Sequence, residues 1–270
     1  MSSLSVGIVG LPNSGKSMLF NALLKRQVAL VAIYPFTTIE PNVGIVPVPD
    51  EQLKRLGELV EAERVVPATV KFIDIAGLVK NAHKGEGLGN QFLAKIREVD
   101  AVVHLIRGFE DTSVSHYYGS IDPQRDKEIV DLELELGGIK KPTLYVLNTD
   151  DKETGGKEKE MLKICAQTGQ GVDNLIKEAY QLLGLITFYT VKGGQEITAW
   201  AIKCGSSALQ AAEKVHTDMA KGFIKAAVIS FKDLVQAGGW QMAQKKGKMR
   251  LEGKDYLLQG GDVIEFKFSL

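Results

Sequence analysis

The sequence contains little cysteine and no long hydrophobic run. Its 270 residues include only two cysteines, Cys165 and Cys204, which lack the spacing of a zinc site or a redox pair. No apolar run approaches the roughly 18 residues of a membrane-spanning helix, and no basic segment followed by an apolar one opens the chain. These absences argue against a disulfide-stabilised secreted protein and against a membrane protein. We therefore expect a cytoplasmic protein with no membrane partner.

The sequence also lacks an excess of either charge. Its 33 Lys and Arg residues equal its 33 Asp and Glu residues, so no overall charge attracts the chain to nucleic acid or membranes. Any such partner must bind a local patch, and we expect no DNA specificity. Hydrophobic residues make up 44% of the chain, which is enough to build the core of one large domain or two modest ones.

One stretch near the start carries a specific signal for phosphate binding. An apolar run over residues 4–9 is followed by the pattern G-x-x-x-x-G-K-S from Gly10 to Ser17. An amphipathic helical run comes next, with apolar residues at helical spacing. Strand, glycine-rich loop and helix occur in the order that a phosphate-binding loop requires.

Each residue type in this loop suits a triphosphate. Gly10 and Gly15 let the backbone turn so that its N–H groups point inward, and the helix N-terminus adds partial positive charge. Lys16 would reach the β and γ phosphates, and the Ser17 hydroxyl would bind Mg²⁺. The residues that we predict to contact the nucleotide in this loop are Asn13, Ser14, Gly15, Lys16, Ser17 and Met18.

Two further segments match the rest of a triphosphate site. Residues 32–44 contain two prolines and two threonines, and we favour Thr38 over Thr37 as the switch threonine that completes the Mg²⁺ shell. An apolar strand over residues 68–73 then runs into Asp74-Ile75-Ala76-Gly77. In that D-x-x-G pattern Asp74 would hold the water shell of Mg²⁺, and the Gly77 N–H would meet the γ phosphate.

The order of elements predicts two domains. Strands separated by helices over residues 1–184 predict an α/β domain with a doubly wound, mostly parallel sheet, whose ligand lies at the carboxyl ends of the strands. From residue 185 to 270, short β runs surround one helix at 208–220. That pattern predicts a small ubiquitin-like α+β domain, with no nucleophile, acid pair or metal spacing.

With these motifs in place, the chain resembles the YchF family of Obg-like ATPases. The residues that carry the resemblance are GIVGLPNSGKS at 7–17, PFTTIEPNVGIV at 35–46, DIAGLVKNAHKGEGLGNQFL at 74–93, KPTLYVLN at 141–148, and HTDMAKGFIKAAVIS with LEGKDYLLQGGDVIEFKF near the end. The resemblance implies an Obg-type nucleotide domain, a C-terminal TGS domain, preference for ATP over GTP, and association with ribosomes or RNA.

The chain departs from this family in several places. Family members carry a helical hairpin where this chain has only residues 136–139, so the insertion is trimmed near 137–138. Family members also carry a further acidic segment near the position where this chain has TGQG, at 168–171. Met18 stands where a second hydroxyl residue is usual, and Asn81 stands where glycine is usual. Any function that resides in the hairpin is therefore not expected of this chain.

The residue after D-x-x-G indicates slow hydrolysis. Many switch enzymes have a glutamine there that orients the attacking water, but this chain has Leu78, which cannot aim a water. The family resemblance implies a loop histidine in its place, and His116 matches that position best. The alternatives are a solvated loop residue and His83. We predict Lys16, Asp74 and His116 as catalytic residues.

Asn13 provides a candidate site for a second ion. An asparagine at this point resembles that of potassium-activated relatives, in which its oxygen helps to hold K⁺ beside the phosphates. The alternative is an asparagine that shapes the loop after Pro12. Cofactors are therefore predicted to be Mg²⁺ and, as a second candidate, K⁺.

The residues predicted to contact the base give conflicting indications of which purine binds. Asn148 and Asp151 follow an apolar strand, and a carboxylate there suits the N1–H and N2–H₂ donors of guanine. However, Thr149 replaces the lysine of the usual N-K-x-D motif, and the resembled family keeps an acid here while preferring ATP. We favour ATP, keep a GTP-specific switch as the alternative, and consider Asn148 the better candidate for a base contact.

The C-terminal region contains a local basic cluster, formed by Lys245, Lys246, Lys248, Arg250 and Lys254. Such a run is either a solvated face or a contact to RNA phosphates. A second functional class therefore remains open beside the enzyme: a nucleotide-gated binding module whose hydrolysis is incidental.

Overall fold

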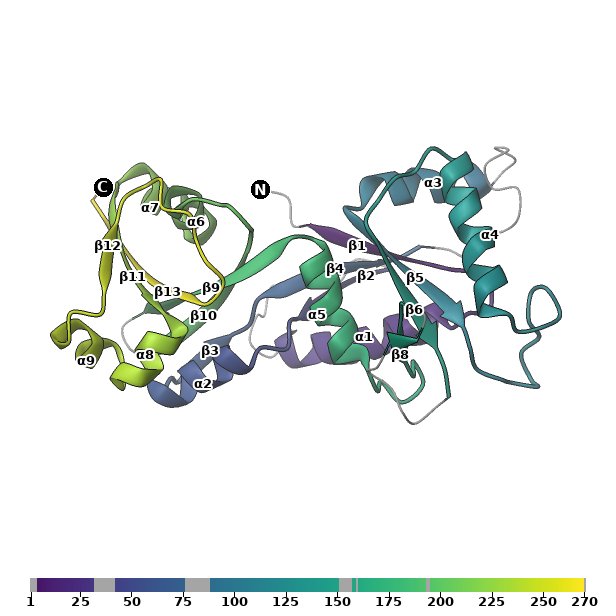
Figure 1. Cartoon of the computed structure of the whole chain (residues 1–270), viewed down its shortest axis with the longest axis horizontal. Coiled ribbons are helices and arrows are strands. Elements are labelled where there is room, and N and C mark those ends of the chain that lie inside the picture. The colour runs from purple at the N-terminus through teal and green to yellow at the C-terminus, as the bar shows by residue number, and fades with distance from the viewer. Residues whose placement is uncertain are drawn as a thin grey trace. The chain divides into compact units, whose positions relative to one another are not determined.

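The computed structural model describes residues 4–31, 42–75, 88–150, 157–158, 160–192 and 195–269. The chain divides into two compact units (Figure 1). The first unit comprises Ser2–Val48 and Val70–Leu183, and the second comprises Met1, Pro49–Thr69 and Gly184–Leu270. No helix in the described ranges is long and apolar enough to cross a membrane.

A seven-stranded sheet forms the centre of the first unit. Its order is β2-β4-β1-β5-β6-β8-β7, and the pairs β4–β1, β1–β5, β5–β6 and β6–β8 are parallel, whereas β7–β8 is antiparallel. The strands are β1 (Ser5–Val9), β2 (Val43–Pro47), β4 (Thr69–Asp74), β5 (Ala101–Arg107), β6 (Thr143–Asn148), β7 (Lys157–Glu158) and β8 (Met161–Ile164). This is the predicted doubly wound, mostly parallel sheet.

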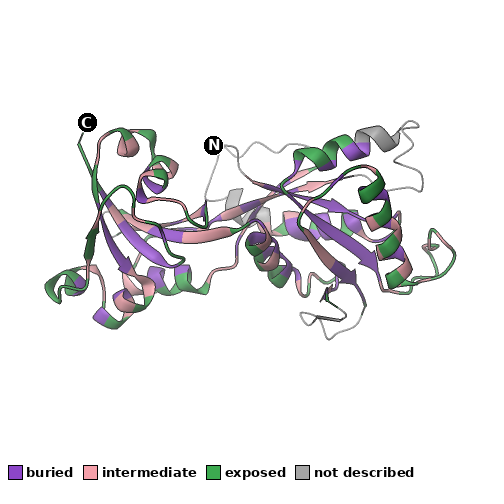
Figure 2. Cartoon of the chain, turned by 45° about the horizontal axis from the view of Figure 1, so that its top comes forward, coloured by how far each residue is buried: buried purple, intermediate pink, exposed green. Residues whose placement is uncertain are grey.

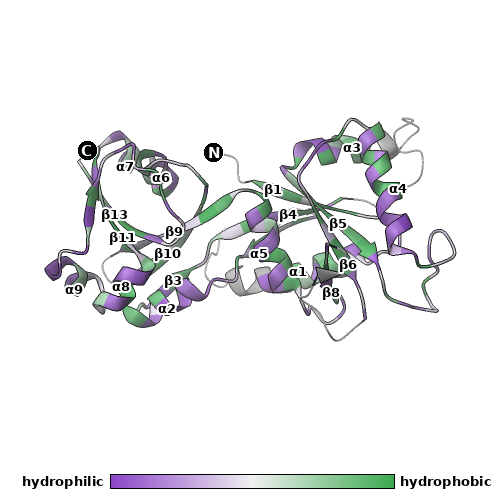
Figure 3. Cartoon of the chain, in the orientation of Figure 1, coloured by the Kyte–Doolittle hydropathy of each residue, from purple (hydrophilic) through white to green (hydrophobic). Residues whose placement is uncertain are grey.

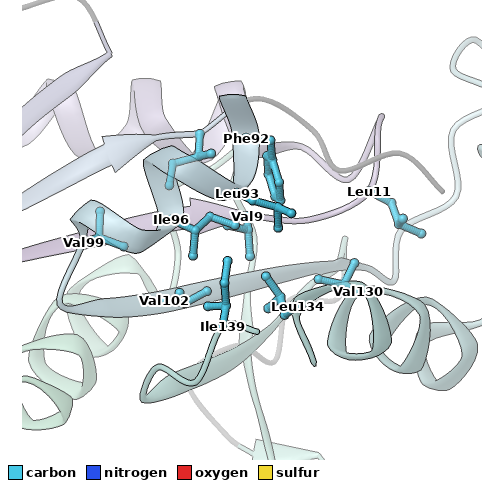
Figure 4. Packing of buried hydrophobic residues seen from close by; sticks show 11 residues of the cluster. Val9, Leu11, Phe92, Leu93, Ile96, Val99, Val102, Val130, Leu134 and Ile139 are labelled. Carbon is cyan, nitrogen blue, oxygen red and sulfur yellow. The ribbon is translucent and has the colours of Figure 1, made fainter. Parts of the chain in front are cut away.

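Helices cover the sheet and explain its apolar strands. The helices of the first unit are α1 (Lys16–Val31), α3 (Leu88–Glu98), α4 (Pro123–Leu136) and α5 (Val172–Leu182). Every residue of β1 and β5 is buried (Figure 2), and both strands are largely hydrophobic (Figure 3), as expected of parallel strands covered on both faces. One core cluster joins α3 and α4 to the sheet (Figure 4), and its buried members include Val9, Phe92, Leu93, Ile96, Val102, Val130 and Leu134.

Helix α4 has well-defined ends. The side chain of Asp122 accepts a hydrogen bond from the Arg125 N–H at 3.1 Å, and Pro123 occupies the first turn, where a missing N–H has no effect. The helix ends at Leu136 with Gly137 as its C-cap, and Gly138 follows with a φ of +68°, in the left-handed region that favours glycine. The chain then enters β6 after a short connection, so α4 is not extended by a hairpin in this protein.

A buried histidine links β5 to α4. His104 is 1% exposed, and its Nδ1 lies 3.6 Å from Asp131 Oδ1, which is too long for a hydrogen bond. Burial lowers the pKa of His104, and this effect outweighs the opposing attraction of Asp131. The imidazole is therefore neutral in the folded protein at a pH where the unfolded chain already binds a proton.

This arrangement predicts a loss of stability on acidification. Because the unfolded state takes up the proton first, the free energy of unfolding should fall as the pH drops below the ordinary histidine pKa of about 6.5. Replacing His104 with Gln should flatten that dependence between about pH 7 and the lower pKa of the folded state. Thermal unfolding of both proteins across this range measures the difference, and parallel curves would contradict the prediction.

The second unit is built on a six-stranded sheet of order β12-β11-β13-β9-β10-β3. Strand β9 pairs antiparallel with β10 and parallel with β13, and β11 pairs antiparallel with β13 and β12. A parallel central pair with an antiparallel neighbour on each side is the predicted ubiquitin-like arrangement. The strands are β3 (Arg64–Val66), β9 (Leu185–Lys192), β10 (Glu196–Lys203), β11 (Phe223–Ser230), β12 (Arg250–Glu252) and β13 (Asp262–Phe268).

The second unit also contains a segment that the sequence analysis assigned to the first. Residues 49–69 form α2 (Glu51–Leu59) and β3, and β3 pairs in parallel with β10. Asp50 caps α2 by accepting hydrogen bonds from two backbone N–H groups, and the Tyr189 hydroxyl donates to its Oδ2 at 2.8 Å. The predicted division into 1–184 and 185–270 therefore differs from the structure here, because long-range strand pairing assigns 49–69 to the second unit.

The helices of the second unit are shorter and more numerous than predicted. The single helix expected at 208–220 is divided into α6 (Ala208–Val215) and α7 (Thr217–Lys221). His216 separates them with extended backbone, and its Nδ1 accepts a hydrogen bond from the Asp218 N–H at 3.2 Å. Two further helices, α8 (Phe231–Ala237) and α9 (Trp240–Lys245), were not predicted. Ser230 begins α8 by accepting from the Asp233 N–H, so a local cap ends the preceding strand.

Candidate phosphate-binding site

The loop between β1 and α1 has the geometry of an anion cradle. Gly10 has a φ of +157°, and a Cβ there would lie 2.3 Å from the Leu105 carbonyl oxygen. Gly15 has a φ of +92°, in the left-handed region, and Asn13 has a φ of +62°. The hydroxyl of Ser14 is buried and has no partner among the described residues. A turn with left-handed residues and an unpartnered buried hydroxyl fits a bound phosphate chain.

The Lys16 ammonium lies inside this cradle. Its Nζ donates hydrogen bonds to the carbonyl oxygens of Gly10 at 3.2 Å and Leu11 at 2.8 Å. Burial lowers the pKa of Lys16 to about 8, although the nearby Asp74 carboxylate acts in the opposite direction. Burial likewise raises the pKa of Asp74, against the attraction of Lys16 and Lys95. Burial therefore disfavours the charged forms of both Lys16 and Asp74. A bound anion beside Lys16 and a bound cation beside Asp74 would offset this desolvation penalty.

Asp74 reaches this position through strand pairing. It ends β4, which runs parallel to β1, and the register places it opposite Ile8. The carboxyl ends of the two strands therefore bring Asp74 beside the loop that begins at Gly10. Ser17 and Met18 lie in the first turn of α1 and are exposed, so the Ser17 hydroxyl is accessible to a metal ion.

Asn148 fastens the phosphate loop to a second loop. Its side chain is buried, and Nδ2 donates to the Ser14 carbonyl oxygen at 3.1 Å while Oδ1 accepts from the Ala166 N–H at 2.9 Å. A Cβ on Gly15 would lie 2.4 Å from the same Nδ2, so glycine is needed for this close approach. The structure thus gives Asn148 a positioning role that the sequence analysis did not predict, beside the predicted contact to the base.

A groove lies next to the hydrogen bond between Asn148 and Ala166. It has a volume of about 540 Å³ and runs between the first half of α1 and the loop after β8. Its lining residues are Met18, Asn21, Ala22, Leu24, Lys25, Ala166 and Gln167. Because Ala166 is hydrogen-bonded to Asn148, the groove and the phosphate loop share one support.

Arg107 is a buried residue of this site that the sequence analysis missed. It ends β5, is 3% exposed, and directs its guanidinium at backbone carbonyl oxygens of the loop over residues 108–119. The acceptors are Phe109 at 3.2 Å, Asp111 at 3.4 Å, Val114 at 2.9 Å and Ser115 at 3.5 Å, with Asn13 of the phosphate loop at 3.5 Å. A cation at the end of an otherwise apolar strand was the signal available in the sequence.

Replacing Arg107 with Lys should loosen this loop. Lysine has three donors on one atom and cannot present the planar fork of the guanidinium, so several partly buried hydrogen bonds to carbonyl groups are lost. We expect the loop to open about 1–3 kcal/mol more easily, measured as faster amide hydrogen exchange over residues 109–119. Arg97→Lys is the matched control, because Arg97 makes one exposed hydrogen bond, to the Gly137 carbonyl. Equal exchange in the two variants would contradict the prediction.

His116, on the same loop, is held by hydrogen bonds at both ring nitrogens. Its Nε2 lies 2.7 Å from Asp126 Oδ2, and its Nδ1 accepts from the Tyr118 N–H at 3.1 Å. The side chain is 6% exposed, so the alternative of a solvated loop residue is wrong. The preceding residue contacts the phosphate loop, because Asn13 Nδ2 donates to the Ser115 carbonyl oxygen at 3.0 Å.

Several predicted site residues lie outside the described residues. These are Thr38 and its alternative Thr37, Gly77, the neighbouring Leu78, His83, and Asp151. Within the described part, the structure brings Asn13, Ser14, Gly15, Lys16, Asp74 and Asn148 together around the phosphate loop.

The basic cluster of the second unit is exposed, but part of its charge is engaged internally. Lys246 Nζ donates to the Ala237 carbonyl oxygen at 3.2 Å, and Arg250 lies 3.9 Å from the buried Asp262 and 3.0 Å from the Tyr256 hydroxyl. These two residues therefore support the fold as well as the surface.

Curated relatives cover this chain from end to end. The "Ribosome-binding ATPase YchF" of Bacillus subtilis is 36% identical over 367 residues, covering 99% of this chain and all of the relative. The protein of the same name from Escherichia coli is 37% identical over 360 residues, covering 98% and 99%. Because this chain has only 270 residues, the relatives carry segments without a counterpart here, in agreement with the predicted loss of insertions.

Family profiles and a solved structure agree with these relatives. Residues 5–149 match a family described as "50S ribosome-binding GTPase", and residues 185–269 match the C-terminal family of YchF GTPases, described as a protein of unknown function. The solved YchF GTPase of Schizosaccharomyces pombe superposes with a TM-score of 0.81 at 25% identity, covering 99% of this chain and 98% of that one. The chain therefore belongs to the YchF family.

Proposed function

We propose that this protein binds ATP and hydrolyses it slowly, and that it acts as a nucleotide-dependent switch. The observation that supports the proposal best is the phosphate loop itself, in which Gly10, Gly15 and the buried Lys16 form a cradle for a triphosphate. Lys16 and the N–H groups at the start of α1 would stabilise the charge that develops on the β and γ phosphates. Catalysis would consist mainly of positioning and charge stabilisation.

Mg²⁺ is the cofactor that this site suits. Ser17 and Thr38 would bind the ion, and Asp74 would hold its water shell. When bound, Mg²⁺ would neutralise charge on the phosphate oxygens. Gly77 would contribute its N–H to the γ phosphate. The raised pKa of Asp74 supports this assignment, because a cation would relieve the penalty of its burial.

K⁺ is the second ion that we propose for this site. Asn13 Nδ2 is engaged by Ser115, which leaves its side-chain oxygen as the atom to face a cation beside the phosphates. Higher phosphate release in potassium than in sodium buffer is the expected result, and equal rates would refute a role for K⁺.

The base is proposed to bind in the groove beside α1. Met18 and Gln167 line this groove, and Asn148 supports it through Ala166. The relatives named as ATPases support ATP, whereas the solved structure is titled a GTPase, so GTP remains the alternative within the same site. Asn148 and Asp151 are the proposed base contacts.

The ribosome is the proposed partner, since curated relatives are named for ribosome binding. The second unit would serve as a TGS-type recognition module, with the exposed basic residues Lys245, Lys248 and Lys254 near RNA phosphates. With the ribosome as its partner, the protein is proposed to act in the cytoplasm. The alternative is a binding module with incidental hydrolysis.

Nucleotide titration separates these possibilities. ATP and GTP are titrated in Mg²⁺ by calorimetry, and phosphate release is followed with each nucleotide. Tighter binding and release with ATP support the proposal, whereas a preference for GTP supports the alternative specificity. Cosedimentation with ribosomes in ATP, ADP and no nucleotide tests the switch, and an affinity that does not depend on the nucleotide would refute it.

His116 is the proposed catalytic histidine, since Leu78 cannot orient a water. Changing His116 to Ala should lower the turnover number about 100-fold or more, with ATP affinity within about twofold. Unchanged turnover would refute its role.

A further inference from the structure

We propose that Asp126 is a positioning residue, which fixes the ring of His116 so that a single nitrogen is presented for the hydrolytic water. This inference rests on the proposed catalytic role of His116, and its test separates the two. Among the described residues, the hydrogen bonds of the Asp126 side chain go to His116 and Arg125 and not to the phosphate loop, so its effect would pass through the histidine.

The two side chains form a short, buried pair. His116 Nε2 and Asp126 Oδ2 are 2.7 Å apart, and the two side chains are 6% and 3% exposed. Water competes little for either partner at this exposure. A short hydrogen bond from an imidazole to a buried carboxylate is strong and directional, so it fixes the plane of the ring.

The neighbouring backbone identifies which nitrogen carries the proton. Tyr118 donates its N–H to His116 Nδ1 at 3.1 Å, so Nδ1 presents a lone pair. Nε2 must then carry the proton and donate it to Asp126. The carboxylate therefore selects one tautomer, as in other sites where an acid orients a histidine.

Asp126 is itself held firmly. Its second oxygen, Oδ1, accepts from Arg125 Nε at 3.3 Å and Nη2 at 3.0 Å. Arg125 also donates to the Ser120 hydroxyl at 3.0 Å, which ties the carboxyl group to the loop that carries His116. Asp126 lies in the first turn of α4, and Val130 and Leu134 of that helix belong to the core cluster. The core of the first unit thus holds α4 in place, and α4 holds the histidine ring in place through Asp126.

The two hydrogen bonds of the ring differ in strength, and this difference determines which nitrogen would bind the hydrolytic water. The bond to Asp126 is short and charge-assisted, whereas the bond from the Tyr118 N–H is longer and comes from a neutral donor. Release of Nδ1 is therefore the easier change. Nδ1 would then accept a hydrogen bond from water while Nε2–H stays on Asp126.

The loop that carries His116 contacts the phosphate loop, so the fixed ring lies on a segment that adjoins the proposed ATP site. Ser115 accepts hydrogen bonds from Asn13 Nδ2 at 3.0 Å and from Arg107 at 3.5 Å. Ser115 is the residue immediately before His116. A shift of the ring would alter turnover without removing any contact to the nucleotide.

The test is a double-mutant cycle of Asp126→Asn and His116→Ala in the full chain. Asn keeps the size of the side chain but removes its charge and offers an amide donor as readily as an acceptor. We expect Asp126→Asn alone to lower the turnover number by about tenfold or more, with KM for ATP within about twofold. In the His116→Ala background, Asp126→Asn should have no further effect.

Asp131→Asn is the matched control, because Asp131 lies on the same helix and faces the other buried histidine, His104. Its turnover should equal that of the parent protein. Nitrogen chemical shifts of the histidine rings provide a readout that is independent of turnover. We expect His116 to be protonated at Nε2 in the parent and to lose this preference in Asp126→Asn.

Three results would overturn the proposal. An equal loss from Asp126→Asn with and without His116 would show that the residue acts by another route. A ring that keeps its tautomer in Asp126→Asn would show that the carboxylate does not select it. Unchanged turnover in His116→Ala would remove the catalytic role on which the inference rests, and the tautomer measurement would still decide whether Asp126 fixes the ring.

Discussion

Replacing Lys16 with Met is expected to abolish tight ATP binding and to stabilise the nucleotide-free protein. Removing a buried, hydrogen-bonded charge from a phosphate site weakens binding by about 2–5 kcal/mol, which is at least roughly 30-fold in affinity. The opposite effect on stability follows from the pKa of Lys16, which burial lowers from 10.5 to about 8.

The sign of the stability effect depends on pH. Below pH 8 the folded protein holds a charged, desolvated ammonium, which opposes folding by up to about 3 kcal/mol for a pKa shift of this size. Between pH 8 and 10.5 the unfolded chain binds more protons than the folded one, so the opposition declines as the pH rises. Met removes it, although the carbonyls of Gly10 and Leu11 lose their donor, so we expect a net gain of about 1–2 kcal/mol at pH 7.

Calorimetry measures both effects. ATP titration should give no heat for the variant, and its melting temperature without nucleotide should exceed that of the parent at pH 7 but not at pH 10. Lys177→Met is the matched control, because Lys177 is exposed on α5 of the same unit and lies outside the groove and the phosphate loop. A less stable Lys16→Met protein at pH 7 would contradict the proposed opposition between folding and phosphate binding.

Replacing Asn148 with Ala is expected to destabilise the first unit even without nucleotide. The change removes the donor to the Ser14 carbonyl and the acceptor of the Ala166 N–H, and both backbone groups lie in buried surroundings. Each unpaired group costs about 1–3 kcal/mol, so we expect a loss of about 2–4 kcal/mol, measured by urea unfolding. ATP affinity should fall as well, because the loop that holds Ser14 and Gly15 loses its support.

Asn148→Asp tests the two contacts separately. A carboxylate keeps an acceptor for Ala166 but places negative charge against the Ser14 carbonyl, so it should destabilise at least as much as Ala. Asn174→Ala is the matched control, since Asn174 is exposed on α5. If Asn148 served only as a base contact, the Ala variant would retain its stability without nucleotide and lose affinity alone.

The parts of this site that could be predicted depend on short sequence distances. The loop from Gly10 to Ser17 is contiguous, and its turn needs glycine and lysine at fixed spacing, so the pattern alone identified it. Asp74 and Asn148 were also found, because each follows an apolar run and parallel strands end at one edge of a sheet. Their exact partners were not predicted. Asn148 was expected to contact the base, and the structure adds its hydrogen bonds to the phosphate loop and to the loop after β8.

Other features depend on contacts that no local sequence pattern reveals. Residues 49–69 have the local pattern of a continuing first domain, yet β3 pairs with β10, more than a hundred residues later. Arg107 reaches five carbonyl oxygens of two loops, and the pairing of His116 with Asp126 requires a loop to fold back onto α4. The hydrogen bonds of Arg107 leave no periodic signal, because their backbone acceptors belong to residues of any type.

The sequence by itself determined the fold class, the position of the phosphate loop and the family, since hydrophobic periodicity and a glycine-lysine pattern are local properties of the chain. Only the tertiary structure decided which segments join each unit, which charges are buried, and which partner holds each polar side chain. The physical reason is that strand pairing and desolvation depend on what surrounds a residue in space. Lys16 and His104 illustrate this, because burial is the largest cause of the lowered pKa of each.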